Sequence, residues 1–213
     1  MISVLLVDDH AVVREGYKAF LSLCQRIGPI YEADCGELAC ALYDRHAPDV
    51  VVMDLSMPGI GGLEAIRRLK ARASGCRILV FSIYQEKVYA LQALKAGAKG
   101  YIAKNTSPQV LVDAVCKIAD GGHFIDHNLA QALALSSAHD AGQSIMETLT
   151  PREFEVFRLL ALGLSTRDAA DKLHLNHKTV CNHSTLIKEK LSVKTLAELT
   201  LLAFREGILP ELK

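Results

Sequence analysis

The chain has 213 residues, of which 50% are hydrophobic and 23% are charged, and its formal net charge at pH 7 is zero. This length allows one large domain or two small ones, each with a sizeable core. A balanced net charge gives no long-range attraction to nucleic acid or to a membrane surface. No apolar run reaches the roughly 18 residues that a membrane-spanning helix needs, and the short apolar start ends in acid, so we expect neither a membrane segment nor a signal peptide. The six cysteines are scattered without CxxC spacing, which indicates reduced thiols in a cytosolic protein.

The first 121 residues alternate between apolar strands and amphipathic helices. Strands are expected at residues 2–7, 29–33, 50–53, 77–82 and 100–103, and helices at 11–24, 36–45, 63–71, 86–96 and 107–119. The run at 50–53 is apolar throughout, which is typical of a strand covered on both faces. Five strand–helix repeats predict a five-stranded, doubly wound parallel sheet.

The composition changes after Gly121 and Gly122. Residues 122–147 mix small and polar residues, and we expect a linker with one weak helix at 129–135. From residue 148 to residue 213 every signal is helical. Thr150, Pro151 and Glu153 form a capping box with proline at the first helical position. Four helices fit this all-α region, at residues 151–162, 165–173, 176–191 and 194–206.

Polar side chains stand where successive strands of the predicted sheet end. These are Asp8 and Asp9 after the first strand, Asp54 after the third, Ser82 at the end of the fourth and Lys104 after the fifth. Each alone is typical of a turn or a solvated surface. Because ligands bind at the carboxyl ends of the strands in open parallel sheets, their combination predicts one shared site.

The chemistry of that site follows from its three carboxylates. They repel one another, and a hard divalent cation such as Mg²⁺ relieves the repulsion. With the metal bound, Asp54 can attack a phosphoryl group as a nucleophile. The metal and Lys104 would balance charge on the transferred oxygens, and Ser82 could donate a hydrogen bond to one of them.

Residues 1–121 resemble the receiver domain of two-component response regulators, which has a flavodoxin-like fold. The resemblance implies that Asp8, Asp9 and Asp54 hold Mg²⁺ together with the backbone carbonyl of Ser56, and that Asp54 is the phosphoacceptor. It also implies that Ser82 and Lys104 sense the phosphoryl group, and that Tyr101 is an aromatic switch. Phosphorylation would add about −1.5 to −2 charges to an acidic place. As Ser82 is drawn to the phosphate, we expect Tyr101 to turn inward and the surface around residues 86–96 to change.

The helical tail contains a helix-turn-helix pattern. The helix that starts after Asn176 places Val180, Ile187 and Leu191 on one face, which should pack inward. Lys178, Asn182, Thr185 and Glu189 lie on the opposite face. Such a second helix can enter a major groove, although the pattern alone fits a dimerising helical bundle equally well.

Residues 149–156, 178–180 and 190–191 resemble the LuxR-type DNA-binding domain, so the whole chain resembles a NarL/FixJ-family response regulator. By this resemblance the groove-facing residues are Lys178, Thr179, Cys181, Asn182 and Thr185, and His183 and Lys190 lie near phosphates. The last helix resembles the dimer contact of the family, formed here by Thr195, Leu196 and Leu199.

The tail departs from that family in its charge. Positions 181 and 184 are often basic in the family, but here they are Cys181 and Ser184, and from residue 147 on ten Lys and Arg face nine Asp and Glu. Because phosphate contacts dominate affinity for DNA, we expect weak non-specific binding with a shallow salt dependence. Asn182 suits an adenine edge.

We therefore expect a cytoplasmic transcriptional regulator rather than an enzyme. A sensor histidine kinase would phosphorylate Asp54 with Mg²⁺, and the resulting homodimer would bind promoter DNA. One alternative is a receiver-fold regulator that is switched by a ligand or by constitutive dimerisation. The other is a Mg²⁺-dependent phosphohydrolase, which would need a second acid two residues after Asp54, where the sequence has Ser56.

Overall fold

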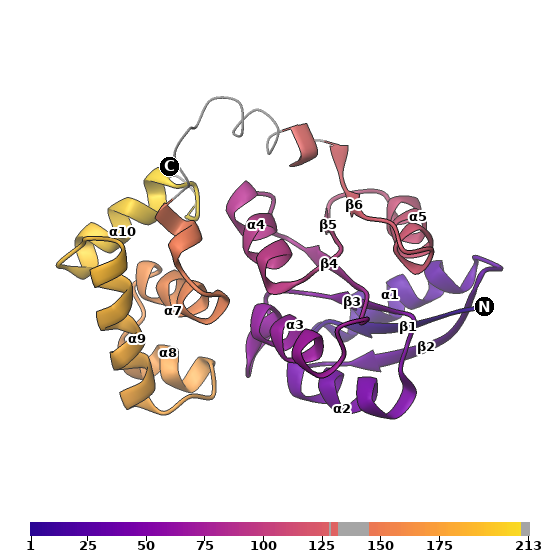
Figure 1. Cartoon of the computed structure of the whole chain (residues 1–213), viewed down its shortest axis with the longest axis horizontal. Coiled ribbons are helices and arrows are strands. Elements are labelled where there is room, and N and C mark those ends of the chain that lie inside the picture. Colours follow the sequence, from indigo (N-terminus) through magenta and orange to yellow (C-terminus); the bar gives the residue numbers. More distant parts are fainter. Residues whose placement is uncertain (128, 132–144, 210–213) are drawn as a thin grey trace.

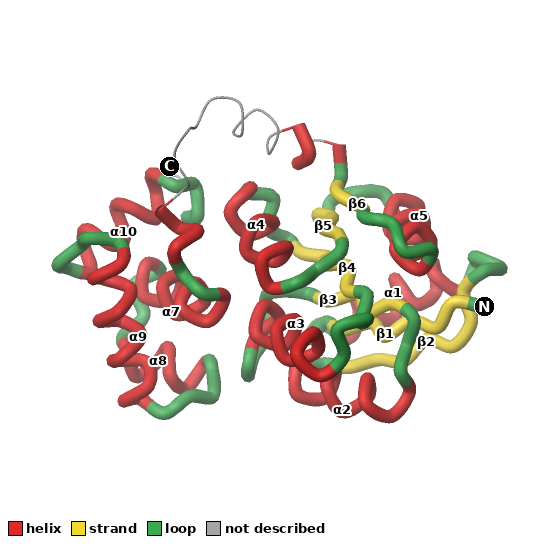
Figure 2. Tube along the Cα trace, in the orientation of Figure 1, coloured by secondary structure: helices red, strands yellow, loops and turns green. Residues whose placement is uncertain are grey.

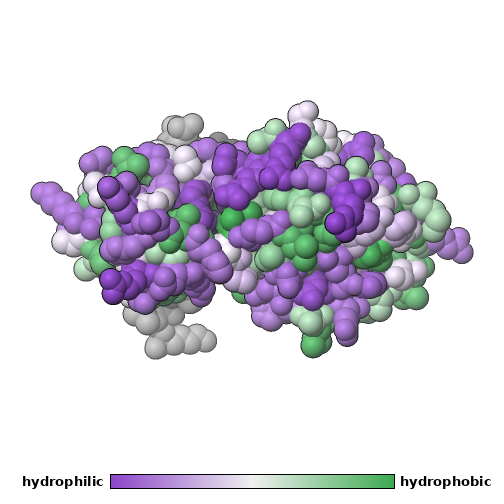
Figure 3. Space-filling model, turned by 90° about the horizontal axis from the view of Figure 1, so that it is seen from below, coloured by the Kyte–Doolittle hydropathy of each residue, from purple (hydrophilic) through white to green (hydrophobic). Residues whose placement is uncertain are grey.

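The computed structural model describes residues 1–127, 129–131 and 145–209. Within these residues the chain forms two lobes joined at a narrow waist (Figures 1 and 3). One lobe is a sheet covered by helices, and the other contains helices and loops (Figure 2). The division follows the sequence, because every apolar strand pattern precedes residue 126 and the helical patterns dominate after residue 148. The expected boundaries at 121–122 and 147–148 stay a prediction.

The sheet contains six parallel strands in the order β2-β1-β3-β4-β5-β6. Their bounds are β1 Ile2–Val7, β2 Ile27–Ala33, β3 Val50–Met53, β4 Ile78–Ser82, β5 Gly100–Ala103 and β6 Phe124–Ile125. Every residue of β3, β4 and β5 is buried, as their apolar runs predict. The doubly wound parallel sheet is confirmed, but the expected count of five strands was wrong. The sixth strand has only two residues, which is too short to show an apolar pattern.

Two layers of helices cover the sheet. Helices α1 Ala11–Ser22 and α5 Pro108–Ala119 pack on one face, where Leu21, Leu111 and Val115 join a buried apolar cluster. Helices α2 Gly36–His46, α3 Gly61–Arg72 and α4 Lys87–Ala96 cover the other face. The carboxyl ends of the strands remain open between these layers, which places their polar terminal residues at one edge.

Two glycines begin α3 directly behind the strand end at Asp54. Gly61 has φ +73°, a backbone conformation that favours glycine. A Cβ at Gly62 would overlap the carbonyl oxygen of Asp54, and a Cβ at Gly61 would overlap the carboxylate of Glu155 from the helical lobe. Both glycines therefore permit a close approach, and α3 begins two residues earlier than the expected Leu63.

The helical lobe contains the four helices that the sequence predicts. They are α7 Pro151–Ala161, α8 Thr166–Lys172, α9 His177–Lys190 and α10 Leu196–Arg205, preceded by a 3₁₀ helix, η1 Ile145–Thr148, which was not expected. The capping box at Thr150 and Glu153 is present, with a second at Ser165 and Asp168. Residues 129–131 are helical, whereas the rest of the expected weak helix, 132–135, lies outside the described residues.

The two lobes meet through α7, which packs against α3 and α4 (Figure 1). The buried cluster on the α3–α4 side of the sheet continues without a break into the helical lobe, where Phe154, Phe157 and Leu160 belong to it. On the face seen from below, hydrophilic side chains dominate both lobes and hydrophobic ones form separate patches (Figure 3). Of the helices among the described residues, none combines the length and the apolar character that crossing a membrane would require.

Candidate phosphoacceptor pocket and DNA-reading face

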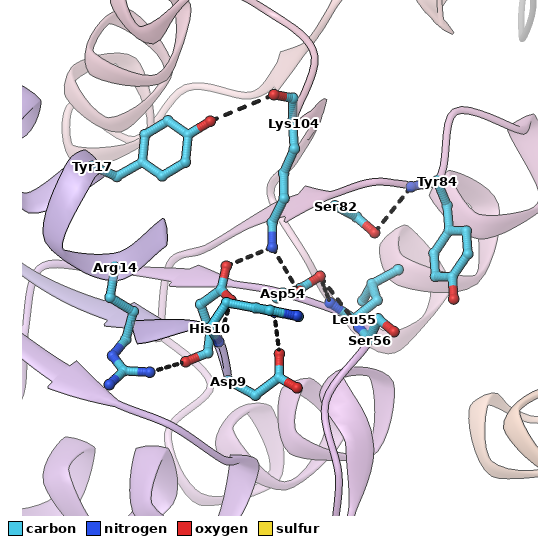
Figure 4. A network of polar contacts seen from close by, with 11 residues as sticks. Asp9, His10, Arg14, Tyr17, Asp54, Leu55, Ser56, Ser82, Tyr84 and Lys104 are labelled. Atoms are coloured by element: carbon cyan, nitrogen blue, oxygen red, sulfur yellow. Dashed lines mark hydrogen bonds and ion pairs between the residues drawn. The ribbon is translucent and has the colours of Figure 1, made fainter. Parts of the chain in front are cut away.

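The strand ends bring Asp54, Ser82 and Lys104 into one pocket (Figure 4), which Asp8 joins through its bond from Lys104. Asp8 and Asp54 are each 2% exposed, and Ser82 is fully buried. Two carboxylates that are this deeply buried need bonded partners, since an isolated buried charge is strongly unfavourable. The charged residues predicted to meet at the strand ends are therefore expected to bond to one another, as the Lys104 contacts with Asp8 and Asp54 show.

Asp54 is held by both carboxylate oxygens. Its Oδ1 accepts hydrogen bonds from the backbone amides of Leu55 at 2.6 Å and Ser56 at 3.2 Å. Its Oδ2 accepts from Lys104 Nζ at 2.8 Å. Burial raises the pKa of Asp54 above its ordinary value, while Lys104 and the Ser56 amide oppose the rise. The two oxygens of Asp54 thus have different partners, backbone amides on one side and the Lys104 ammonium on the other.

Lys104 joins the two buried acids. Its Nζ also donates to Asp8 Oδ2 at 2.5 Å. Burial lowers the pKa of Lys104, but the contacts with Asp54 and Asp8 outweigh it and hold this pKa above its ordinary value. Lys104 therefore stays charged and neutralises much of the negative charge of the pocket.

A second group of acidic and imidazole ligands lies beside this pocket. Asp8, Asp9 and His10 offer ligand atoms within 4.8 Å of one another. Asp9 Oδ1 is buried and makes no hydrogen bond among the described residues, although His10 Nδ1 is 2.9 Å away. A carboxylate oxygen whose neighbour is an exposed imidazole, next to Asp8, fits a hard cation. The Asp54 carboxylate is not part of this group, and the sequence did not indicate His10.

Tyr101 differs from the expected switch in one respect. Its ring is fully buried, and its hydroxyl donates to the backbone carbonyl of Tyr84 at 2.7 Å. Burial raises the pKa of this hydroxyl, and Ser82 is a hydrogen-bonding neighbour that opposes the rise. The inward turn expected of Tyr101 is already made here, so turning inward is not a change available from this conformation.

Two side chains of α1 support the pocket and were missed by the sequence analysis. Arg14 Nη1 donates to the carbonyl oxygen of Asp8 at 2.6 Å, and the Tyr17 hydroxyl donates to the carbonyl oxygen of Lys104 at 3.4 Å (Figure 4). Both fix the backbone that carries a pocket residue. Their only sequence signal is a position on the helix that follows Asp8 and Asp9.

The predicted groove-facing residues lie together on α9. Lys178, Asn182 and Thr185 are exposed, and Thr179 and Cys181 are half-buried. Val180 and Ile187 are fully buried on the opposite side, and Leu191 is 3% exposed, which confirms the predicted inward face. Asn176 caps the helix by accepting from the Lys178 amide at 2.9 Å. The sheet lobe is contacted mainly through α7, and η1 also packs against α4.

The two residues expected near phosphates are placed differently. Lys190 donates to both carboxylate oxygens of Glu153, at 2.8 Å and 2.6 Å. His183 is half-buried, and burial lowers its pKa below the ordinary value. Both side chains are therefore less available to a phosphate as free positive charges than the sequence indicates.

The expected dimer contact on α10 needs a correction. Thr195 caps the helix by accepting from the Glu198 amide at 3.1 Å, and Leu196 is 43% exposed. Leu199, however, is fully buried in the helical lobe and cannot touch a second chain in this conformation. Leu201, half a helical turn further on, is an apolar residue with 69% of its surface exposed. The sequence placed Leu199 outward because its helical face was assigned without knowing where α7 packs.

Comparison with known families identifies both lobes. Residues 4–116 match the response regulator receiver domain, and residues 147–203 match the bacterial regulatory proteins of the luxR family. The chain therefore belongs to the response regulators that combine a receiver domain with a LuxR-type domain, the NarL/FixJ family. This agrees with the resemblance seen in the sequence.

Full-length relatives support the assignment. The chain is 41% identical over 208 residues to the transcriptional activator protein ExaE of Pseudomonas putida, which covers 97% of both chains. It is 36% identical over 209 residues to the response regulator UvrY of Escherichia coli K12, covering 98% of this chain and 96% of that one. Among solved structures, RcsB of Salmonella enterica bound to promoter DNA is similar with a TM-score of 0.71 and 25% identity, over 95% of this chain and 98% of that one.

Proposed function

We propose that a sensor histidine kinase, or a small acyl phosphate, phosphorylates Asp54 with the help of Mg²⁺, and that phosphorylated chains form a homodimer that binds promoter DNA. The observation that supports this most is the buried bonding of Lys104 to both Asp8 and Asp54. A structural ion pair needs one acid, whereas a phosphoryl-transfer site needs a nucleophile, metal ligands and a cation together. Because promoter DNA is the target, we place this action in the cytoplasm.

The residues of the pocket divide the work. Asp8, Asp9 and Asp54 would hold Mg²⁺ with the Ser56 carbonyl, and the bound ion would shield charge on the transferred phosphoryl oxygens. Asp54 Oδ2 forms the new bond to phosphorus, while the bond to the donor group breaks. Lys104 Nζ, now bonded to Asp54 Oδ2, can follow the charge onto a phosphoryl oxygen. The Ser82 hydroxyl can donate to another.

The helical lobe supplies the DNA contacts. The exposed Lys178, Asn182 and Thr185 would face base edges and phosphates from α9. A single lobe carries little net positive charge, so two copies reading two half-sites are needed for firm binding. We propose that Leu196 and Leu201 of α10 contribute to pairing, because both are exposed apolar residues on that helix.

The proposal is tested by incubating the full chain with acetyl phosphate and Mg²⁺ and measuring its intact mass. We expect a gain of one phosphoryl group, about 80 Da, that is absent in Asp54→Asn and absent when EDTA removes the metal. Asp34→Asn is a matched control, because Asp34 is an exposed aspartate that follows β2 at the same edge of the sheet. Phosphorylation of Asp54→Asn, or turnover of phosphate esters without a retained adduct, would contradict the proposal.

A further inference from the structure

Tyr84 connects the phosphoacceptor pocket with the loop before α4. Its backbone amide donates to the Ser82 hydroxyl at 3.3 Å, and its carbonyl oxygen accepts from the buried Tyr101 hydroxyl at 2.7 Å. Figure 4 shows the Ser82 hydroxyl facing this amide, while the Tyr84 ring points away from the acids. The backbone of Tyr84 is therefore held by Ser82, which in the proposed function donates to a phosphoryl oxygen, and by the buried Tyr101.

The ring of Tyr84 faces the helical lobe. It stacks on Tyr89 of α4 with ring centroids 4.1 Å apart and an interplanar angle of 7°. From α7, Arg158 Nη1 donates to the Tyr84 hydroxyl at 2.5 Å, and the guanidinium lies 5.3 Å from the centre of the Tyr84 ring. Tyr84 is thus contacted from the pocket through its backbone and from the other lobe through its side chain.

Further contacts between the lobes surround this pair. The Tyr89 ring meets Phe154 of α7 edge-on at 5.4 Å, and its hydroxyl donates to the Ile208 carbonyl oxygen at 3.3 Å. Arg152 Nη1 donates to the Ile60 carbonyl oxygen at 2.8 Å. Among these contacts, the Arg158–Tyr84 contact is the one that involves a residue bonded directly to Ser82.

We propose that Tyr84 transmits the phosphorylation state of Asp54 to the helical lobe, and that its contact with Arg158 is released when Asp54 is phosphorylated. This inference rests on the proposed function of Asp54. Because the Tyr101 ring is already buried, an inward turn of this ring cannot carry the signal. When Ser82 turns toward a phosphoryl oxygen, its long 3.3 Å bond to the Tyr84 amide is lost. The backbone of Tyr84 then keeps only its bond to Tyr101, and the Tyr84 ring shifts relative to Arg158.

Release of this contact changes where the DNA-binding lobe can go, rather than uncovering it. The reading residues Lys178, Asn182 and Thr185 are already exposed while the lobes are docked. Docking through α7 instead fixes the direction in which each α9 points relative to its receiver domain. Two freed DNA-binding lobes can orient as a pair over two half-sites. A docked lobe cannot change its direction in this way.

The test uses thermodynamic reciprocity in the full chain. If phosphorylation weakens docking, then a substitution that weakens docking must strengthen binding of a phosphoryl mimic, because the two equilibria are coupled. We expect Arg158→Gln and Tyr84→Phe to bind beryllofluoride with Mg²⁺ at least about fivefold more tightly than the parent chain. Arg167→Gln, which changes an exposed arginine of α8, should leave this affinity unchanged.

Small-angle scattering supplies a second readout. The parent chain should expand when beryllofluoride binds, whereas Arg158→Gln and Tyr84→Phe should be expanded with or without it. Circular dichroism shows whether each variant is folded, and Tyr84→Phe retains the ring that stacks on Tyr89. Unchanged beryllofluoride affinity in both folded variants, or a parent chain that binds the mimic and stays docked, would overturn the role of Tyr84. Failure of the parent chain to bind beryllofluoride would instead contradict the proposed function.

Discussion

The phosphoacceptor pocket and the DNA-reading face differ in how their polar groups are used. In the pocket, Asp8 and Asp54 are almost fully buried and share Lys104. On α9 the reading residues are exposed, and the nearby Lys190 is bonded to Glu153 of its own lobe. The pocket thus pairs its buried charges within one chain, whereas the reading face has little charge to offer, and for this reason the proposed function relies on two copies for affinity.

The largest expected effect tests whether a second copy binds through α10. On this helix Leu199 belongs to the core and Leu201 to the surface. We expect Leu199→Ala to lower the free energy of unfolding by about 2–5 kcal/mol, because it leaves a cavity at a fully buried site. Leu201→Ala should change it by less than about 0.5 kcal/mol and weaken self-association of the phosphorylated protein. Urea titration and analytical ultracentrifugation measure the two effects. A stable Leu199→Ala protein that fails to dimerise would restore Leu199 as a dimer contact.

The stability of the folded chain should depend on pH through Glu155, which lies on α7 where the two lobes meet. Burial raises the pKa of Glu155 to about 7, against the opposing effect of Arg152 and Arg158 and with the help of Glu64. The folded state therefore holds this proton more tightly than the unfolded chain. Its stabilising contribution is complete below the ordinary pKa and is lost as the pH rises through about 7.

Urea titrations of the parent chain at several pH values between about 5 and 8 should show stability falling by at most about 3 kcal/mol. Glu155→Gln, which cannot titrate, should remove most of this slope. Glu153→Gln is the matched control. Although burial raises the pKa of Glu153, hydrogen bonds from Lys190 keep it below its ordinary value, so its contribution is constant in this range. An equal slope in Glu155→Gln and the parent chain would contradict the assignment.

The smallest expected effect concerns the salt dependence of DNA binding. Lys178 is exposed on the reading face, so Lys178→Gln should reduce the slope of log K against log salt by about 1. Lys190→Gln should leave that slope nearly unchanged and lower stability instead, because Glu153 loses its partner. Fluorescence anisotropy at several salt concentrations measures the slopes. A loss of about 1 in the slope for Lys190→Gln would show that this lysine leaves Glu153 for a phosphate.

The pocket could be predicted because its pattern is local. Asp8, Asp54 and Lys104 each follow an apolar strand directly and Ser82 ends one, and parallel strands bring their carboxyl ends to one edge. The four helices of the tail followed in the same way from caps and apolar periodicity. Each of these signals lies within a few residues of the feature that it predicts.

The contacts between the lobes could not be predicted in this way. Tyr84 and Arg158 lie in different domains, and neither belongs to a pattern that names the other. The inward position of Tyr101 and the pairing of Lys190 with Glu153 are choices among side-chain rotamers that depend on packing. Leu199 shows the same limit, since a helical wheel identifies an apolar face without showing which neighbour covers it.

Gly61 serves two neighbours at once. Its left-handed backbone shapes the turn behind Asp54, and the space left by its missing side chain admits the carboxylate of Glu155 from the other lobe. Any larger residue would strain the backbone behind the phosphoacceptor and force the Glu155 carboxylate to move in the same step. A substitution here would therefore be pleiotropic: chemistry and domain arrangement could not drift independently at this position during evolution.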